Sequence, residues 1–300
     1  MTRPTAIPLC LTVLLLASCS PGAAGAPSPS ASLSPSPSPS ATPSLPRGAN
    51  ELVLRYETAG GFVPHEFLLS SYPTISIYGD GTAITEGPQI AIYPGPALPN
   101  LIATKIGEAG LQRLLGLAAD AGLLGPDAHY DAIGIADAGT ATFTVVAAGT
   151  RHTISAYALN ESEDRGLDRA VAAERARLRA FVTRLADLRG SLGRDQVGAE
   201  GPFHFSAVRL FVQAGILGEG PAQPGIDWPL ATPLASFGEP AQPGGGDDLR
   251  CGVVSGRDLE TLRPLLMKAS QATPWRSGGR VYSLRIRVLL PDESGCPGVE

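Results

Sequence analysis

Tyr282-Ser283-Leu284-Arg285-Ile286-Arg287-Val288 carries the clearest secondary-structure signal in this chain of 300 residues. Apolar side chains alternate with polar ones along it, and successive side chains of a β-strand point to opposite faces of the sheet. We therefore expect the apolar set to be buried and Ser283, Arg285 and Arg287 to face solvent. The pattern predicts a strand over residues 282–290 with one buried face.

The sequence before this strand predicts a further strand at 251–254 and a helix that reaches about Ala269. Ser255 and Asp258 have the spacing of a helix-capping pair. Pro264 lies inside the helix and is expected to kink or break it, because proline removes one backbone hydrogen bond.

A strand is also predicted at 205–212, and residues 215–248 are so rich in Pro and Gly that they predict a long loop. We expect 242–248 to be mobile. Trp228 in this loop and Trp275 beyond it are the only tryptophans. Each is either a binding residue in a groove for a sugar or peptide or a core anchor for the loop.

Residues 48–193 predict strands, a helix, more strands and a last helix. We expect helices at 107–122 and 165–188, where apolar residues recur every three or four positions. The arginines of the second helix alternate with acids, which is typical of a solvated helix face. The strands are expected at 51–56, 74–78, 82–85, 89–93, 101–104, 141–146 and 152–157, with an Asp80-Gly81 turn joining the second to the third.

These elements predict an α+β fold. We expect two small domains or subdomains, 48–193 and 202–300, each of antiparallel strands or hairpins packed with one or two helices. About 250 residues suffice for one large domain or two small ones.

Leu16-Ala17-Ser18-Cys19 closes an apolar run that follows Arg3, and this order is typical of an export signal. The run is far shorter than the ~20 residues of a membrane-spanning helix. The four residues resemble a bacterial lipobox. The resemblance implies cleavage between Ser18 and Cys19, so that residues 1–18 are removed, and a diacylglycerol on the Cys19 thiol that anchors the chain to the outer face of the cell membrane. The alternative is an ordinary secretory signal without an anchor.

Residues 19–47 are almost entirely Ser, Pro, Ala, Gly and Thr. Such a composition cannot bury enough apolar surface to fold, and it predicts an extended, disordered stalk, either bare or O-glycosylated. The whole chain has a formal net charge of −5 and no basic block, which argues against a nucleic-acid partner.

Cys251 and Cys296 are the two cysteines left after Cys10 leaves with the signal and Cys19 takes the lipid. An exported chain usually pairs such cysteines, so we predict a disulfide and expect the strands at 251–254 and 282–290 to be neighbours. Two separately buried thiols are the alternative; a metal site lacks further ligands at the right spacing.

Catalytic motifs are scarce. The four histidines, His65, His129, His152 and His204, lie in different elements and form no zinc-binding pattern. No serine-nucleophile elbow, phosphate-binding loop or dinucleotide fingerprint is present. We predict neither a metal nor a cofactor, and no catalytic residue.

Two resemblances bear on function. The lipobox, the stalk and Arg250-Cys251-Gly252-Val253 are similar to uncharacterised lipoproteins of high-GC Gram-positive bacteria, which implies an anchor and no particular activity. Residues 52–188 are similar to small proteinaceous inhibitors of metalloproteases, through Gly60-Gly61-Phe62, a helix, a hairpin with Arg151-His152-Thr153 and a last helix. The hairpin at 74–85 departs from that family.

The leading hypothesis is therefore a lipid-anchored extracytoplasmic module that binds a protein, peptide or cell-wall partner and is not an enzyme. The alternatives are an inhibitor of a secreted metalloprotease, for which Gly60, Gly61 and Phe62 are the candidate binding residues, and a hydrolase with an unrecognised site.

Overall fold

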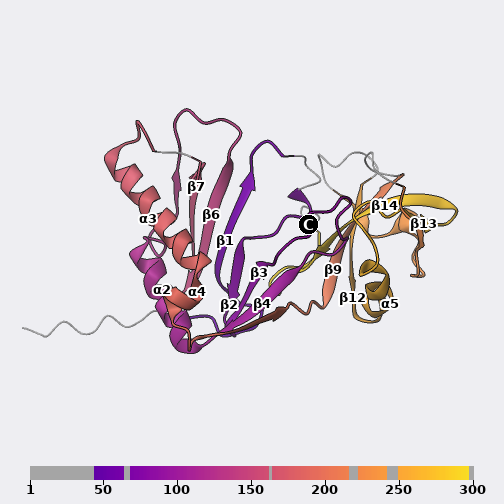
Figure 1. Cartoon of the computed structure of the whole chain (residues 1–300), viewed down its shortest axis with the longest axis horizontal. Coiled ribbons are helices and arrows are strands. Elements are labelled where there is room, and N and C mark those ends of the chain that lie inside the picture. The colour runs from indigo at the N-terminus through magenta and orange to yellow at the C-terminus, as the bar shows by residue number, and fades with distance from the viewer. Residues whose placement is uncertain (1–43, 64–67, 162–163, 216–221, 242–248, 297–300) are drawn as a thin grey trace, which may run out of the picture. The chain divides into compact units, whose positions relative to one another are not determined.

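The computed structural model describes residues 44–63, 68–161, 164–215, 222–241 and 249–296 (Figure 1). The predicted export signal, Cys19, most of the predicted stalk, His65 and the segment 242–248 lie outside the described residues. The described residues all belong to one compact unit, Thr42–Glu300. They contain four helices and two mixed β-sheets, so the predicted α+β class is confirmed. The division into two domains stays a prediction.

The first sheet has eight strands in the order β5-β7-β6-β1-β2-β3-β4-β8. All its pairs are antiparallel except β5 with β7. Its last strand, β8, follows the second predicted helix and pairs with β4. The bounds are β1 Leu52–Gly60, β2 Ile75–Tyr78, β3 Thr82–Glu86, β4 Leu101–Ile106, β5 Ala128–Tyr130, β6 Gly139–Ala147, β7 Thr150–Tyr157 and β8 Val197–Pro202.

The predicted strand at 89–93 is wrong. These residues run between β3 and β4 without pairing in either sheet. Proline has no backbone N–H to donate to a ladder, and Pro88 and Pro94 bracket the segment.

The Asp80-Gly81 turn between β2 and β3 is confirmed. Gly81 has φ +83°, and a Cβ at this position would lie 2.1 Å from the carbonyl oxygen of Ile106. Asp80 accepts hydrogen bonds from the backbone N–H of Thr82 at 2.9 Å and from the ammonium of Lys105 at 2.6 Å. Only glycine fits the second position, because φ is positive and β4 lies close to this turn.

Three helices pack beside the first sheet (Figure 1): α2 Glu108–Asp120, α3 Arg169–Ala186 and α4 Leu188–Leu192. Phe143 of β6 is at the centre of their contact with the sheet. Its ring stacks on Tyr56 with centroids 4.7 Å apart and meets the edge of Phe181 at 6.1 Å. Both predicted helices are therefore confirmed, although the second ends at Ala186 and is followed by the short α4.

The prediction of a solvated arginine face on α3 is wrong for Arg175, whose side chain is fully buried. Its guanidinium bonds to Asp164 at 2.5 Å and donates to four backbone carbonyls at 2.8–3.3 Å. Arg179 binds the second oxygen of Asp164. A buried arginine is tolerated because its donors are satisfied, and helical periodicity does not reveal those partners.

Asp164→Asn is expected to destabilise the fold by about 2–3 kcal/mol at pH 7, because hydrogen bonds to a charged group are lost. Burial opposes ionisation of Asp164, but the hydrogen bonds from Arg179 and Arg175 outweigh it and lower its pKa below 3.8. A carboxylate with a lowered pKa stabilises the fold above its unfolded pKa and loses that effect as the pH falls. Urea unfolding should therefore show the gap between variant and wild type shrinking below about pH 4; a constant gap down to pH 3 would contradict this assignment.

The second sheet has six strands in the order β10-β13-β14-β9-β12-β11. Its helix is α5 Gly256–Leu266, which packs its buried leucines against the apolar face of the sheet. The strands are β9 Ala207–Ala214, β10 Ile226–Asp227, β11 Glu239–Pro240, β12 Arg250–Ser255, β13 Trp275–Ser277 and β14 Arg280–Val288.

β14 is the strand predicted at 282–290, but the expectation that one face meets solvent is wrong. Ser283 and Arg287 are buried and Arg285 is half-buried. Arg287 donates to the carbonyl of Ser71 and pairs with Glu293. A segment from the first region and the chain after β14 therefore cover the polar face, and this long-range contact is invisible in the alternating pattern.

The predicted disulfide between Cys251 and Cys296 is confirmed, with the two Cα atoms 6.0 Å apart. The expectation that their strands are neighbours is wrong, because β9 lies between β12 and β14. Cys296 follows β14 by enough residues to reach across β9.

The start of α5 also differs from the prediction. Ser255 precedes the helix, but its side chain makes no capping hydrogen bond. Pro264 does not break the helix, which continues to Leu266. Arg263 before it donates to the carbonyl of Phe205 at 2.9 Å and lies over the Phe205 ring at 4.1 Å, which fastens this turn to the segment before β9.

The chain after β14 is held by both sheets. Asp292 accepts hydrogen bonds from the Tyr78 hydroxyl and from Arg55, each at 2.8 Å. The carbonyl of Gly295 accepts from Arg209 of β9 at 2.7 Å. One apolar cluster likewise contains Leu52 and Tyr78 of the first sheet together with residues of the second.

Candidate functional site

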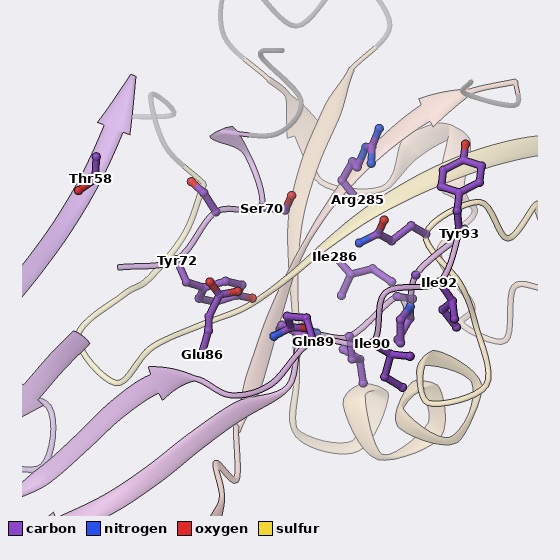
Figure 2. A pocket seen from close by; sticks show the side chains of 17 residues that line it. Thr58, Ser70, Tyr72, Glu86, Gln89, Ile90, Ile92, Tyr93, Arg285 and Ile286 are labelled. Carbon is purple, nitrogen blue, oxygen red and sulfur yellow. The ribbon is translucent and has the colours of Figure 1, made fainter. Parts of the chain in front are cut away.

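A pocket of about 750 Å³ is lined mainly by the connection between β3 and β4, residues 70–72 before β2, and β14, with Thr58 of β1 and Gln271 at its margin (Figure 2). A volume in this range is typical of ligand sites. We call it the β14 pocket. Its walls come from segments that are far apart in the sequence.

The connection between β3 and β4 supplies the apolar wall of the β14 pocket. Ile90, Ile92 and Tyr93 leave 65%, 57% and 69% of their surfaces exposed. The segment itself is fixed at both sides: Gly87 donates to the carbonyl of Asn100 at 2.7 Å, and the carbonyl of Gly95 accepts from Gln271 at 2.8 Å. Three large exposed apolar side chains in one fixed segment are typical of an interaction site.

Tyr72 and Glu86 line the pocket opposite this wall, and the arginine next to Tyr72 already has its partners within the fold. Arg287 lies over the ring of Tyr72 at 4.4 Å and pairs with Glu293. The hydroxyl of Tyr72 accepts from the backbone N–H of Val288 at 2.7 Å. Burial raises the pKa of Glu86 at the pocket wall, and the positive charge of Arg287 opposes this shift only in part. The charge of Arg287 is therefore already paired within the fold, with the carboxylate of Glu293.

Arg285, unlike Arg287, has no partner for its guanidinium among the described residues. Its Nε atom is buried and has no hydrogen-bond partner, and no acid within the described ranges forms an ion pair with its guanidinium. A buried donor without a partner is unfavourable by about 1–3 kcal/mol. Figure 2 places Arg285 on one side of the β14 ribbon and Ile286, with Ile90 and Ile92, on the other. The pocket thus offers an unpaired cation next to an exposed apolar surface.

A nucleophile activated by an adjacent base is the usual sign of covalent catalysis. The described residues that line the pocket include the hydroxyls of Ser70, Ser71 and Thr58 but no histidine. No cluster of three or more His, Cys, Asp or Glu within the part of the chain that the structure describes could hold a metal ion. An anionic ligand with an apolar part fits the groups that are present.

A second polar cluster lies at the edge of the first sheet. His129 bonds to the hydroxyl of Ser155 at 2.7 Å through Nδ1 and to Asp131 at 3.1 Å through Nε2. These residue types match a catalytic triad, but His129 and Asp131 are 51% and 81% exposed, so water competes for every bond. His152 bonds to the carbonyl of Gly125 instead. The sequence did not single out Ser155, because its contact with His129 comes from the parallel pairing of β5 with β7.

The candidate residues predicted from the sequence lie apart from the β14 pocket. Gly60 and Gly61, each with φ +82°, end β1 and turn the chain so that Phe62 is 90% exposed. Trp275 is buried, and Trp228 meets it edge-to-face at 6.0 Å within the core of the second sheet. This packing accounts for both tryptophans without a ligand. Cys19 lies outside the described residues.

None of the helices in the described ranges is both long and apolar enough to span a membrane. Comparisons with protein-family models, curated proteins and solved structures found no match to this chain.

Proposed function

We propose that this chain is a lipid-anchored extracytoplasmic module that binds an anionic, partly apolar partner in the β14 pocket and catalyses no reaction. The observation that supports it most is Arg285, whose buried Nε lacks a partner beside a wall of exposed apolar residues. A ligand carboxylate would satisfy this donor. Ile90 and Ile92 would bury apolar area in the same event.

The proposed anchor depends on Leu16-Ala17-Ser18-Cys19 and on residues 20–46 after it, which carry no charge. Cys19→Ala removes the thiol that would carry the lipid, so the variant is expected in the medium or unprocessed in the membrane fraction. Fractionation of cells and the mass of the mature amino terminus measure this. A processed, membrane-bound Cys19→Ala protein would overturn the lipobox interpretation.

Site-specific photo-crosslinking in intact cells tests the pocket. A photoreactive amino acid in place of Ile92 should give a covalent adduct with a partner, and Arg285→Gln in the same chain should abolish it. The matched control replaces Met267, which is exposed directly after α5 and outside the residues that line the pocket. The proposal fails when both positions give the same adducts or when position 92 gives none.

Inhibition of a metalloprotease is the second candidate, favoured by Phe62, which projects from two consecutive glycines of positive φ. A phenylalanine exposed in this way could enter the apolar specificity pocket of a protease. Full-length protein should then inhibit a secreted metalloprotease of the producing organism at micromolar concentration, and Phe62→Ala should remove the inhibition. No inhibition by the wild type would end this candidate.

Hydrolysis is the last alternative and depends on Ser155 and His129. We expect no turnover of ester, amide or glycoside substrates by the full-length protein. Turnover that Ser155→Ala abolishes would replace the binding proposal.

A further inference from the structure

The backbone of β14 alternates in the direction of its hydrogen-bonding groups. The carbonyl of Val281 accepts a hydrogen bond at 2.9 Å from the backbone N–H of Gly215, which directly follows β9. The carbonyl of Val281 therefore points toward β9. The N–H of Val288 donates to the hydroxyl of Tyr72 at 2.7 Å, so that group points away from β9. In an antiparallel pair these directions alternate with every residue. Leu284 and Ile286 therefore direct their N–H and C=O groups away from β9, as Val288 does.

β13, the strand on this side of β14, is too short to form hydrogen bonds with the backbone groups of Leu284 and Ile286. β13 pairs with β14 only from Arg280 to Tyr282. Beyond that point the described residues place no strand on this side of β14, and none of them forms a hydrogen bond with the N–H or C=O of Leu284 or Ile286. Both residues are buried. Buried backbone groups are almost always paired. The N–H and C=O groups of Leu284 and Ile286 therefore call for a partner from outside the described residues.

The β14 pocket lies along the same edge, because Arg285 and Ile286 line it. Successive side chains of a strand point to opposite faces, and residues directly opposite on paired strands share a face. A strand added here would place the residue opposite Arg285 on the arginine side. The residues before and after it would lie on the side of Ile286, Ile90 and Ile92 (Figure 2).

We propose that the β14 pocket binds an extended peptide segment of a partner protein, which adds a strand to the edge of β14 at Leu284–Ile286. The segment carries an acidic residue that pairs with Arg285, flanked by two apolar residues that pack beside Ile90 and Ile92. Main-chain bonds supply affinity in this mode of recognition and alternate side chains supply specificity. This inference rests on the proposed function and names its ligand.

Fluorescence anisotropy with a capped peptide, acetyl-Thr-Val-Glu-Val-Thr-amide labelled with fluorescein, tests the inference on the full-length protein in detergent. The peptide should bind saturably. Glutamine in place of its glutamate should weaken binding at least about tenfold, because a close charge pair is lost. Methylation of the two backbone nitrogens that face β14 should abolish binding, since it removes donors to the strand edge.

Variants of the protein identify the site. Arg285→Gln should reduce the affinity for the glutamate peptide to that for the glutamine peptide. Arg280→Gln, on the exposed start of the same strand, is the matched control and should bind as the wild type does. Ile92→Asp changes an exposed side chain, so its fold should survive, and it should also weaken binding, whereas Met267→Asp should not.

Equal binding of the glutamate and glutamine peptides, or undiminished binding after backbone methylation, would overturn strand addition. So would the absence of any binding. Should position 92 still form an Arg285-dependent crosslink in cells while the peptide does not bind, the pocket would keep its proposed function and lose this ligand.

Discussion

Arg175→Met should lower the free energy of unfolding by about 3–5 kcal/mol, because removing one partner of a buried charged network leaves the others unsatisfied. The guanidinium of Arg175 is the donor for four backbone carbonyls, those of Tyr130, Asp131, Tyr157 and Ala158, at 2.8–3.3 Å. Methionine fills a similar volume, but it donates nothing. Urea-induced unfolding of the full-length protein measures the change.

Arg177→Met is the matched control from the same helix. The Arg177 side chain is about half exposed and, among the described residues, forms its ion pair with Glu174 one turn earlier, so its loss should change stability by less than about 0.5 kcal/mol. Equal effects of the two substitutions would show that burial of Arg175 does not stabilise the contact of α3 with the sheet.

The second large effect is expected at the disulfide. Replacing both Cys251 and Cys296 by serine should destabilise the fold by about 4 kcal/mol, because the bond closes a loop of 45 residues. The unfolding midpoint in urea measures this. Dithiothreitol should lower the midpoint of the wild type and leave that of the double variant unchanged.

Loss of the disulfide should also loosen the wall of the β14 pocket. Asp292 and Glu293, which precede Cys296, bond to Arg55 and Arg287, and Arg287 in turn lies over Tyr72. If the double-serine variant is as stable as the wild type, these ion pairs alone hold the chain after β14. That result would contradict the stabilising role of the Cys251–Cys296 disulfide.

Local patterns in the sequence predict much of the fold. The turn at Asp80-Gly81, the helix at α2 and the strand at β14 each depend on residues close together in the chain, and all three are confirmed. The disulfide is predicted from the number of cysteines left in a chain that is expected to be exported, and the disulfide itself is confirmed.

The sequence does not predict features that depend on contacts between distant segments. The alternation along β14 marks Arg285 and Arg287 as solvent-facing, because it carries no information about distant segments such as the one around Ser71, which bonds to Arg287. The periodicity of α3 cannot distinguish Arg175, which is buried, from Arg177, which is not. The insertion of β9 between β12 and β14 likewise depends on sheet order.

The β14 pocket was beyond prediction for the same reason. Ile90, Ile92 and Tyr93 suggest a strand from their sequence, and prolines on either side prevent it. Arg285 is one of many arginines. The strand edge beside it is left open because β13 begins at Trp275, opposite Tyr282, and so pairs with β14 only before Arg285. The candidates chosen from the sequence were Phe62, through a resemblance to metalloprotease inhibitors, and the two tryptophans, through their residue type; neither choice carries information about the segments that meet at β14.

Amide hydrogen exchange tests the central claim, that the β14 pocket is a binding site for a peptide strand, most directly. In the full-length protein, the amides of Leu284 and Ile286 should exchange slowly with deuterium only when acetyl-Thr-Val-Glu-Val-Thr-amide is present. In the Arg285→Gln variant the peptide should give no such protection. Exchange at these two amides that is unchanged by saturating peptide, or protection that appears at another strand edge instead, would contradict the account.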